Sequence, residues 1–218
     1  MNKKVSLAPR IAFILLVLVT LGCGASSETA SEPEATEAPF KVPAKLPVMS
    51  NARIFRQQLP GGFEEISMAG VIHDGLASEG DEQYLPEEAF AYVNKKDFQV
   101  IFGMNFLLVN TMNRIGFNAA LEDSDTLKEF AEAMGGENIR DETMIETMDN
   151  LGEKRSVMTM LADVEGVPMR VNVAMFQRSV IGAVLVSMWT EGEEAKISFE
   201  KLVQLFDKRV QESLDRAQ

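Results

Sequence analysis

The chain has 218 residues, 46% of them hydrophobic, and its 33 acidic residues against 21 basic ones give a formal net charge of −12. This length supplies one ordinary domain with a sizeable core. An acidic excess of this size repels nucleic acid, which excludes a nucleic-acid partner.

Residues 1–22 have the composition of a secretory signal. A basic start is followed by an uninterrupted apolar run over 11–19 and then by small residues. The apolar run is too short for a comfortable membrane span, and the combination is typical of a segment that directs secretion and is then removed. We therefore expect the rest of the chain to lie outside the cytoplasm.

Cys23, the only cysteine, directly follows this segment. The residues Leu21-Gly22-Cys23 resemble the lipobox of bacterial lipoproteins. This resemblance implies that Cys23 is diacylated on sulfur, becomes the first residue of the mature chain, and holds it at the cell membrane on the cell-surface or periplasmic side. Two alternatives stay open, namely an uncleaved signal anchor and ordinary cleavage after Ala25 with loss of Cys23. With Cys23 acylated, no disulfide is possible and the fold rests on its core.

Residues 24–50 are rich in Ala, Ser, Thr, Glu and Pro and poor in large apolar side chains. Such a segment cannot bury enough surface to offset the entropy of ordering it, so we expect a disordered acidic tether over 23–50. As a flexible coil it would span on the order of 30 Å. The remaining residues, 51–218, are expected to form a single globular domain.

The first strongly apolar stretch of this domain is 98–109. Periodicity alone does not separate a buried strand from a buried helix in a run of this kind. We predict a strand at 98–102, with the later residues turning helical towards Leu121.

A short helix is predicted at 126–134, because apolar residues recur there at helical spacing and Gly135-Gly136 follows. The acidic residues 122–125 precede it. They are interpreted as its cap rather than as a calcium loop, because Leu127 stands where a loop ligand is needed.

Three strands follow in the C-terminal third of the chain. Residues 155–163 and 169–176 are predicted strands joined by a turn at Glu165-Gly166. Every odd position of 169–176 is apolar, which indicates one face in the core. Residues 180–189 are almost wholly apolar and rich in β-branched side chains, as in a central strand covered on both faces. Together they predict an antiparallel meander.

A C-terminal helix begins after Ser198, which can cap its first turn. Six apolar residues fall on one face of it at helical spacing, namely Phe199, Leu202, Val203, Phe206, Val210 and Leu214. We expect that face to lie on the meander. The sequence therefore predicts an α+β fold, in which an antiparallel sheet packs against this helix and one or more shorter helices.

From about Leu151 to Leu214, this order of strands and closing helix is similar to the sheet-and-helix domain of PsbP-like proteins and of the mycobacterial LpqN-type lipoproteins. The resemblance implies an α+β sandwich with a binding or assembly role. It rests on element order, so no functional residue is carried over.

The sequence offers few groups for catalysis. His73 is the only histidine, which excludes sites that need two, and no GxSxG turn is present for a serine triad. His73, in AGVIHDG, is interpreted as a surface residue of a loop. Acylation removes Cys23 from thiol chemistry, and no glycine loop for phosphate appears, so no catalytic, cofactor or metal site is predicted.

Methionine is unusually frequent, with 13 in all. Methionine is a flexible apolar filler that is also common on surfaces accepting varied apolar ligands. We interpret those in or near the predicted sheet as core filling rather than as a copper site. They are Met144, Met148, Met158, Met160, Met169, Met175 and Met188.

Three classes of function remain. The first is a lipid-anchored, non-catalytic binding or protein-interaction module on the outer side of a membrane. The second is a carrier of a lipid or another apolar ligand between sheet and helix. The third is an enzyme, whose cleft would have to bring acids together from distant parts of the chain.

Overall fold

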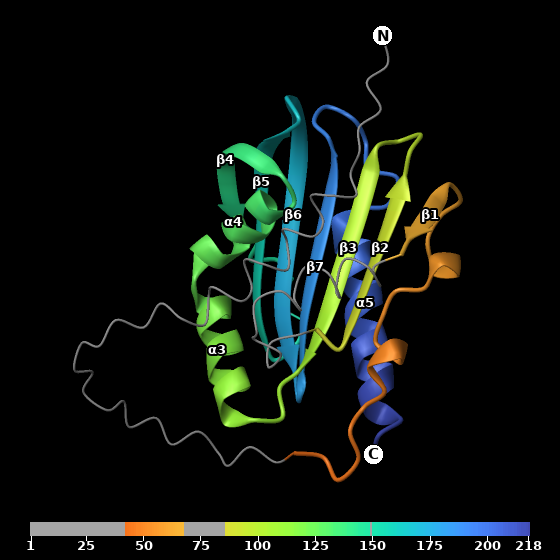
Figure 1. Ribbon diagram of the computed structural model, residues 1–218, viewed down its shortest axis with the longest axis vertical. Helices are drawn as coiled ribbons and strands as arrows, with labels where there is room; N and C mark the ends of the chain where they lie inside the picture. Colours follow the sequence, from red (N-terminus) through yellow and green to blue (C-terminus); the bar gives the residue numbers. More distant parts are fainter. Residues whose placement is uncertain (1–41, 68–85, 149) are drawn as a thin grey trace, which may run out of the picture.

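The sheet is the centre of the fold. The computed structural model describes residues 42–67, 86–148 and 150–218, and within them seven strands form one antiparallel sheet in the order β1-β2-β3-β7-β6-β5-β4 (Figure 1). The strands are β1 (Phe63–Ile66), β2 (Glu88–Asn94), β3 (Gln99–Leu107), β4 (Gly136–Met144), β5 (Lys154–Val164), β6 (Val167–Arg178) and β7 (Ile181–Thr190).

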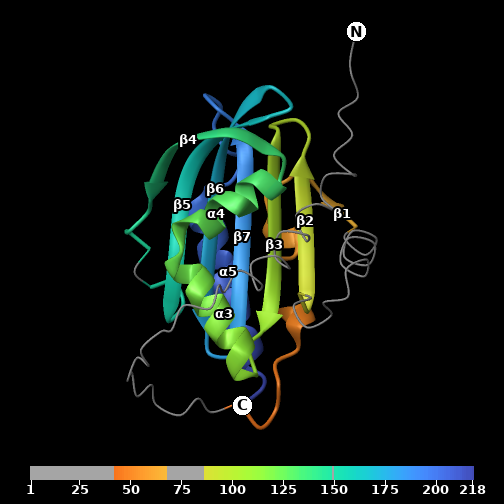
Figure 2. The same ribbon diagram turned by 60° about the vertical axis from the view of Figure 1, so that its left-hand side comes forward.

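Helices cover both faces of this sheet. On one face lies α5 (Phe199–Asp215), and on the other lie α3 (Thr111–Glu122) and α4 (Ser124–Ala133), as Figures 1 and 2 show. Two short turns, η1 (Met49–Asn51) and η2 (Arg56–Gln58), belong to a segment whose buried residues join the core under α5. The predicted α+β fold is confirmed, in the form of a sheet between two helical layers.

The predicted meander is confirmed in β5, β6 and β7. The turn between β5 and β6 is Glu165-Gly166, and both residues have left-handed backbone angles, with φ of 53° and 78°. β7 is the middle strand, buried on both faces as predicted. Only one face of β6 was expected in the core, but Ala174 and Phe176 at its even positions are buried under α5 as well. A sheet covered on both sides buries both sets of side chains.

The strand predicted at 98–102 is longer than expected, and the helix after it begins later. β3 continues to Leu107, and α3 begins at Thr111 after Asn110, whose side chain accepts a hydrogen bond from the Asn113 backbone N–H at 2.7 Å. Gly103 is needed within the strand, since a β-carbon there would stand 2.2 Å from the Phe90 ring. Gly103 therefore meets a packing requirement of the strand.

The outermost strand β4 is irregular. Its pairing with β5 shifts register twice, and Asn138 and Asp141 have left-handed φ values of 50° and 53°. Most of its side chains are exposed. The sequence does not predict this strand, because neither alternation nor an apolar run marks it.

The segment before β1 is docked on α5, which moves the start of the domain. Pro47 and Met49 are buried, and Ser213 Oγ on α5 donates a hydrogen bond to the Val48 carbonyl at 2.9 Å. Arg209 donates to the Asn51 carbonyl at 2.8 Å. We assigned residues up to 50 to the tether, and this boundary was wrong, because the folded part begins near Pro47.

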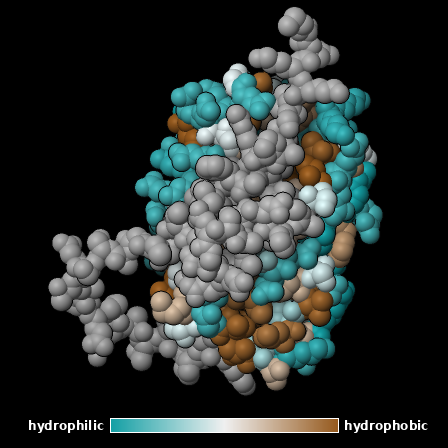
Figure 3. Space-filling model, viewed as in Figure 1, coloured by the Kyte–Doolittle hydropathy of each residue, from teal (hydrophilic) through white to brown (hydrophobic). Residues whose placement is uncertain are grey.

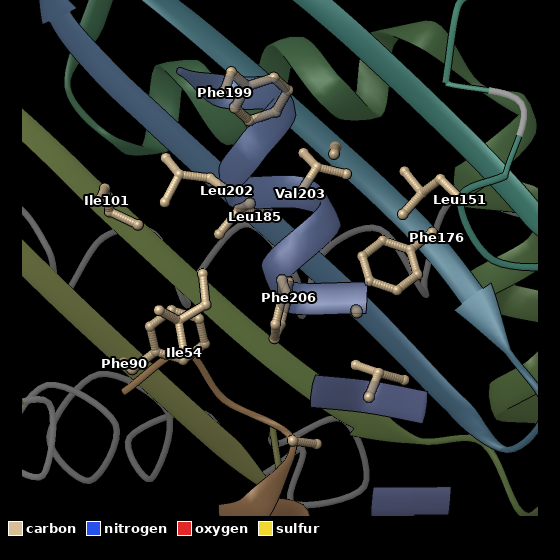
Figure 4. Close-up of a cluster of buried hydrophobic side chains, with 14 of the residues drawn as sticks. Ile54, Phe90, Ile101, Leu151, Phe176, Leu185, Phe199, Leu202, Val203 and Phe206 are labelled. Atoms are coloured by element: carbon tan, nitrogen blue, oxygen red, sulfur yellow. The ribbon is translucent and has the colours of Figure 1, made fainter. Parts of the chain in front are cut away.

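The face of α5 predicted to be apolar lies on the sheet. All six of its predicted residues are buried, and Ser198 caps the helix through a 3.4 Å hydrogen bond from the Lys201 backbone N–H to its hydroxyl. Figure 4 shows Phe206 between Phe90 and Phe176. It meets both rings edge-on, at centroid distances of 5.3 and 5.7 Å. Edge-on packing of this kind fixes the position of the helix.

Candidate binding surfaces

Cys23 and His73, two residues singled out from the sequence, lie outside the described residues. The predicted lipidation of Cys23 therefore stays a prediction. Of the residues 122–125, Asp123 is the cap of α4, because its Oδ1 accepts a hydrogen bond from the Asp125 backbone N–H at 3.0 Å. Across the described ranges, no group of three or more potential ligand side chains could hold a metal ion.

Methionines line the face of the sheet that α3 and α4 cover. We call it the methionine layer, and it consists of Met104, Met134, Met158, Met160, Met169, Met175 and Met188, all buried. Core filling is thus confirmed for five of the seven methionines considered from the sequence. Met144 is instead 45% exposed on β4, and Met148 packs on the α5 side. The layer is soft, because methionine side chains adapt their shape easily.

The two helices over this layer are held differently. In α4, Leu127, Phe130 and Ala131 are buried against the layer. In α3, Leu121 is buried, and Phe117 packs beside Gly182 and lies 6.0 Å from the Phe106 ring. The N-terminal half of α3 is therefore held by few apolar contacts. A helix end held in this way can detach from the core at a low cost in free energy.

Most of the exposed large apolar side chains gather at one end of the molecule, whereas Phe98, Met144 and Val167 lie elsewhere. We call this surface the apolar end, and its residues are Val42, Leu46, Val48, Met112 and Ile115, with exposed fractions from 41% for Val42 to 70% for Met112. The segment 42–48 and the start of α3 lie at the same end in both ribbon views, and Figure 3 shows hydrophobic residues gathered at the lower end of its face.

Contacts with one turn bring these two segments together. The Leu108 backbone N–H, just before α3, donates to the Val180 carbonyl at 2.7 Å. Pro43 shares a pocket of about 190 Å³ with Ser179 and with Leu214 of α5. Residues 179 and 180 form the β6–β7 turn, so both segments border it.

The apolar end carries no carboxylate of its own. The segments 42–48 and 107–119 contain Lys45 and Arg114 as their charged residues, in a chain where acids outnumber bases. At the opposite end, acids and bases are mixed, because Glu191 pairs with Arg170 and Lys196 lies in the same connection from β7 to α5. The absence of carboxylates is therefore a property of the segments 42–48 and 107–119.

The pocket beside the apolar end is built from groups that bond to each other. The Arg178 guanidinium donates two hydrogen bonds of 2.7 Å to the Asp207 carboxylate on α5. Glu153 accepts from the Ser179 backbone N–H at 3.0 Å. The Arg178 pair fastens α5 to the sheet, and the Glu153 contact holds the β6–β7 turn, so the pocket lies where these elements pack together.

A second polar cluster fastens the N-terminal segment to the edge of the sheet. Arg53 forms ion pairs with Glu65 and with Glu88, the latter at 3.0 Å, and donates to the Tyr92 hydroxyl. Tyr92 donates in turn to the Ile54 carbonyl at 2.7 Å. Burial raises the pKa of Tyr92. Burial alone would lower the pKa of Arg53, but its hydrogen bonds to Tyr92 and Glu65 raise it, so Arg53 stays charged.

Glu129 on α4 is an ionisable group in an unfavourable place. Burial raises its pKa, and the negative charges of Asp123, Glu132 and Asp125 raise it further. Its Oε2 atom is buried without a hydrogen-bond partner among the described residues. The carboxylate form therefore opposes the packing of α4.

None of the helices in the described ranges is long and apolar enough to cross a membrane. In comparisons with known proteins, no family model matches the chain, and no curated protein matches it.

Proposed function

We propose that this chain is an extracytoplasmic bacterial lipoprotein, held to a membrane through acylated Cys23, whose domain is a non-catalytic binding module. The observation that carries the proposal is the position of the apolar end. The segment leading from Cys23 enters the described domain at Val42, within that surface. An anchored domain would thus present its exposed apolar side chains towards the membrane and its components.

The polar clusters support a binding rather than a catalytic role. Arg53 and Arg178 are each held by carboxylates, and their partners join the sheet to the N-terminal segment or to α5. Catalytic groups are usually placed in a cleft with room for a substrate. These clusters instead lie where elements of the fold pack against each other.

Replacement of the anchor residue tests the proposal. Cys23→Ser should release the protein into the aqueous phase of a detergent phase separation or leave it uncleaved, because a hydroxyl cannot replace the acylated sulfur. Ser27→Ala is the matched control and should stay in the detergent phase. An unchanged lipid-modified mass in Cys23→Ser would refute the anchor.

The partner can be sought with the same pair of chains. Crosslinking in intact membranes, followed by pull-down, should capture a defined set of molecules with the anchored chain. The same molecules should be missing when the Cys23→Ser chain is used. Equal capture by both chains would show that the anchor does not bring the domain to its partner.

The methionine layer favours a second candidate function, a carrier of a lipid or another apolar ligand. The layer is apolar and adaptable, and it lies partly beneath α3, whose N-terminal half has few apolar contacts. A native mass spectrum of the chain purified from membranes should then show a co-purified lipid. A spectrum of the chain alone would leave the methionines as core filling.

A further inference from the structure

We propose that the apolar end is a lipid-contact surface, on which the anchored domain stands with Met112 and Ile115 of α3 at the level of the lipid headgroups. The inference rests on the proposed function, since it requires the anchor at Cys23.

The start of α3 exposes two apolar side chains. Met112 and Ile115 are three residues apart and so lie on the same side of the helix, with exposed fractions of 70% and 56%. A β-carbon on the neighbouring Gly116 would meet no described atom of another element within 4 Å. This side of α3 is therefore an open, protruding apolar surface. Side chains so presented suit insertion between headgroups.

The stretch of chain between the anchor and this surface is short enough to keep the domain close to the bilayer. Residues 24–41 separate Cys23 from Val42 and would span about 25 Å as a flexible coil. A tether of this length holds the domain near the bilayer at an effective concentration in the millimolar range. Even a weak lipid contact is then populated.

Charge also bears on this surface. Membrane surfaces with anionic lipids repel carboxylates. The segments 42–48 and 107–119 carry none, and their charged residues are Lys45 and Arg114. These two segments can therefore meet anionic lipid headgroups without placing a carboxylate of their own among them.

The small size of the surface favours lipid over a protein partner. A stable protein interface of standard size uses about 20–30 residues on each side. The apolar end offers five exposed apolar side chains from two segments. Contact with a bilayer needs only a few inserted apolar residues, because the acyl anchor supplies the rest of the affinity.

The test uses the full chain, purified with its anchor and reconstituted in phosphatidylcholine vesicles that contain a quarter of phosphatidylglycerol. Acylation leaves Cys23 without a thiol, so a new cysteine is the one reactive position. An environment-sensitive dye is attached in Ile115→Cys. The matched control is Val167→Cys, an apolar residue with 45% exposure in β6 near the β5–β6 turn, at the opposite end of the sheet.

The dye at position 115 should be about threefold less accessible to an aqueous quencher than the dye at position 167, since interfacial side chains lie about 5–10 Å deep. Adding Lys45→Glu and Met112→Glu to Ile115→Cys should restore accessibility to the control level. Met112→Cys provides a second labelling position that should be shielded in the same way.

Each other outcome is decisive. Equal quenching at 112, 115 and 167 on a chain that floats with the vesicles and has the acylated mass overturns the lipid contact and leaves the anchor intact. Shielding in native membranes but not in pure lipid vesicles means that a protein covers the surface, which also overturns it. A chain without the acylated mass that does not float overturns the proposed function, and the lipid contact with it.

Discussion

The two faces of the sheet are covered by cores of different character. Under α5 the core contains a group of aromatic rings among its aliphatic side chains, and Phe206 is fixed edge-on against Phe90 and Phe176. Under α3 and α4 the core contains the methionine layer among other apolar side chains. Rigid rings allow one arrangement, whereas flexible thioether chains allow several of similar energy. On one face of the sheet the covering helix is therefore held in one position, and on the other face the core can change its shape.

The way the covering elements are held follows the same division. On the α5 side, Arg209 bonds to the carbonyls of Asn51 and Arg53, residues more than 150 positions away in the sequence. On the other side, α3 presents Met112 and Ile115 to its surroundings. The α5 side is therefore tied to distant parts of the chain, whereas α3 leaves apolar side chains exposed.

The largest effect should come from the α5 side. Phe206→Ala is expected to lower the free energy of unfolding by about 3–5 kcal/mol, because it removes a fully buried ring and leaves a cavity. Denaturant titration of a chain that begins at Val42 measures this. The exposed Lys208 on the same helix is the control, and Lys208→Ala should cost less than about 0.5 kcal/mol. Similar small effects would mean that α5 does not hold the sheet.

The N-terminal segment should give the next largest effect. Removal of 42–50 is expected to cost about 2–3 kcal/mol, because it exposes the site of Met49 and leaves the Ser213 hydroxyl without its Val48 partner. Removal of the predicted tether, 24–41, should leave the melting temperature within error. A loss of stability in the second deletion would contradict the predicted tether.

The methionine layer should respond weakly to a change of shape. Met160 is fully buried, and Met160→Leu keeps nearly the same volume, so we expect a loss below about 1.5 kcal/mol. Phe206→Leu, in the aromatic core, should lose more, because a smaller, branched chain cannot replace two edge-on contacts. Equal losses in denaturant titrations would remove the distinction between the two cores.

The smallest effect is expected from Glu129 on α4. Its pKa is raised in the folded chain, so its ionisation opposes folding above that pKa, and this penalty disappears below the ordinary glutamate pKa of about 4.3. Glu129→Gln should therefore raise stability at neutral pH by less than about 1 kcal/mol. The gain should shrink as the pH is lowered.

Melting temperatures at neutral and acidic pH measure this difference. The exposed Glu137 on β4 offers the control Glu137→Gln, which should change little. A gain from Glu129→Gln that is the same at both pH values would show that the carboxyl group is not the cause.

Local patterns were sufficient to predict the C-terminal part of the fold. β5, β6, β7 and α5 are adjacent in the sequence and pack on each other, so alternation and helical spacing predict both the elements and their contacts. β2 was missed, because it is buried on both faces and pairs with strands through contacts that no local period marks. The docking of the N-terminal segment was missed because its partners on α5 are distant in the sequence.

The candidate surfaces were only partly accessible from the sequence. The core position of Met158, Met160 and Met175 follows from strand alternation, but their common layer requires the sheet order. Met112 and Ile115 look like core residues of a helix, and only the packing of α3 shows that they are exposed. The signal that could have indicated their proposed role is the absence of carboxylates over 98–121.

The irregular strand β4 also bears on how copies of this chain behave when many lie close together. A regular outer strand offers a row of free backbone groups, on which a second copy can add its own strand and begin an aggregate. β4 breaks that row, because Asn138 and Asp141 turn the backbone aside and the ladder shifts beside them. Its exposed charges add repulsion between copies. If the chain is anchored to a membrane as proposed, copies would meet edge to edge more often than in solution, and the irregular β4 would disfavour pairing through this edge.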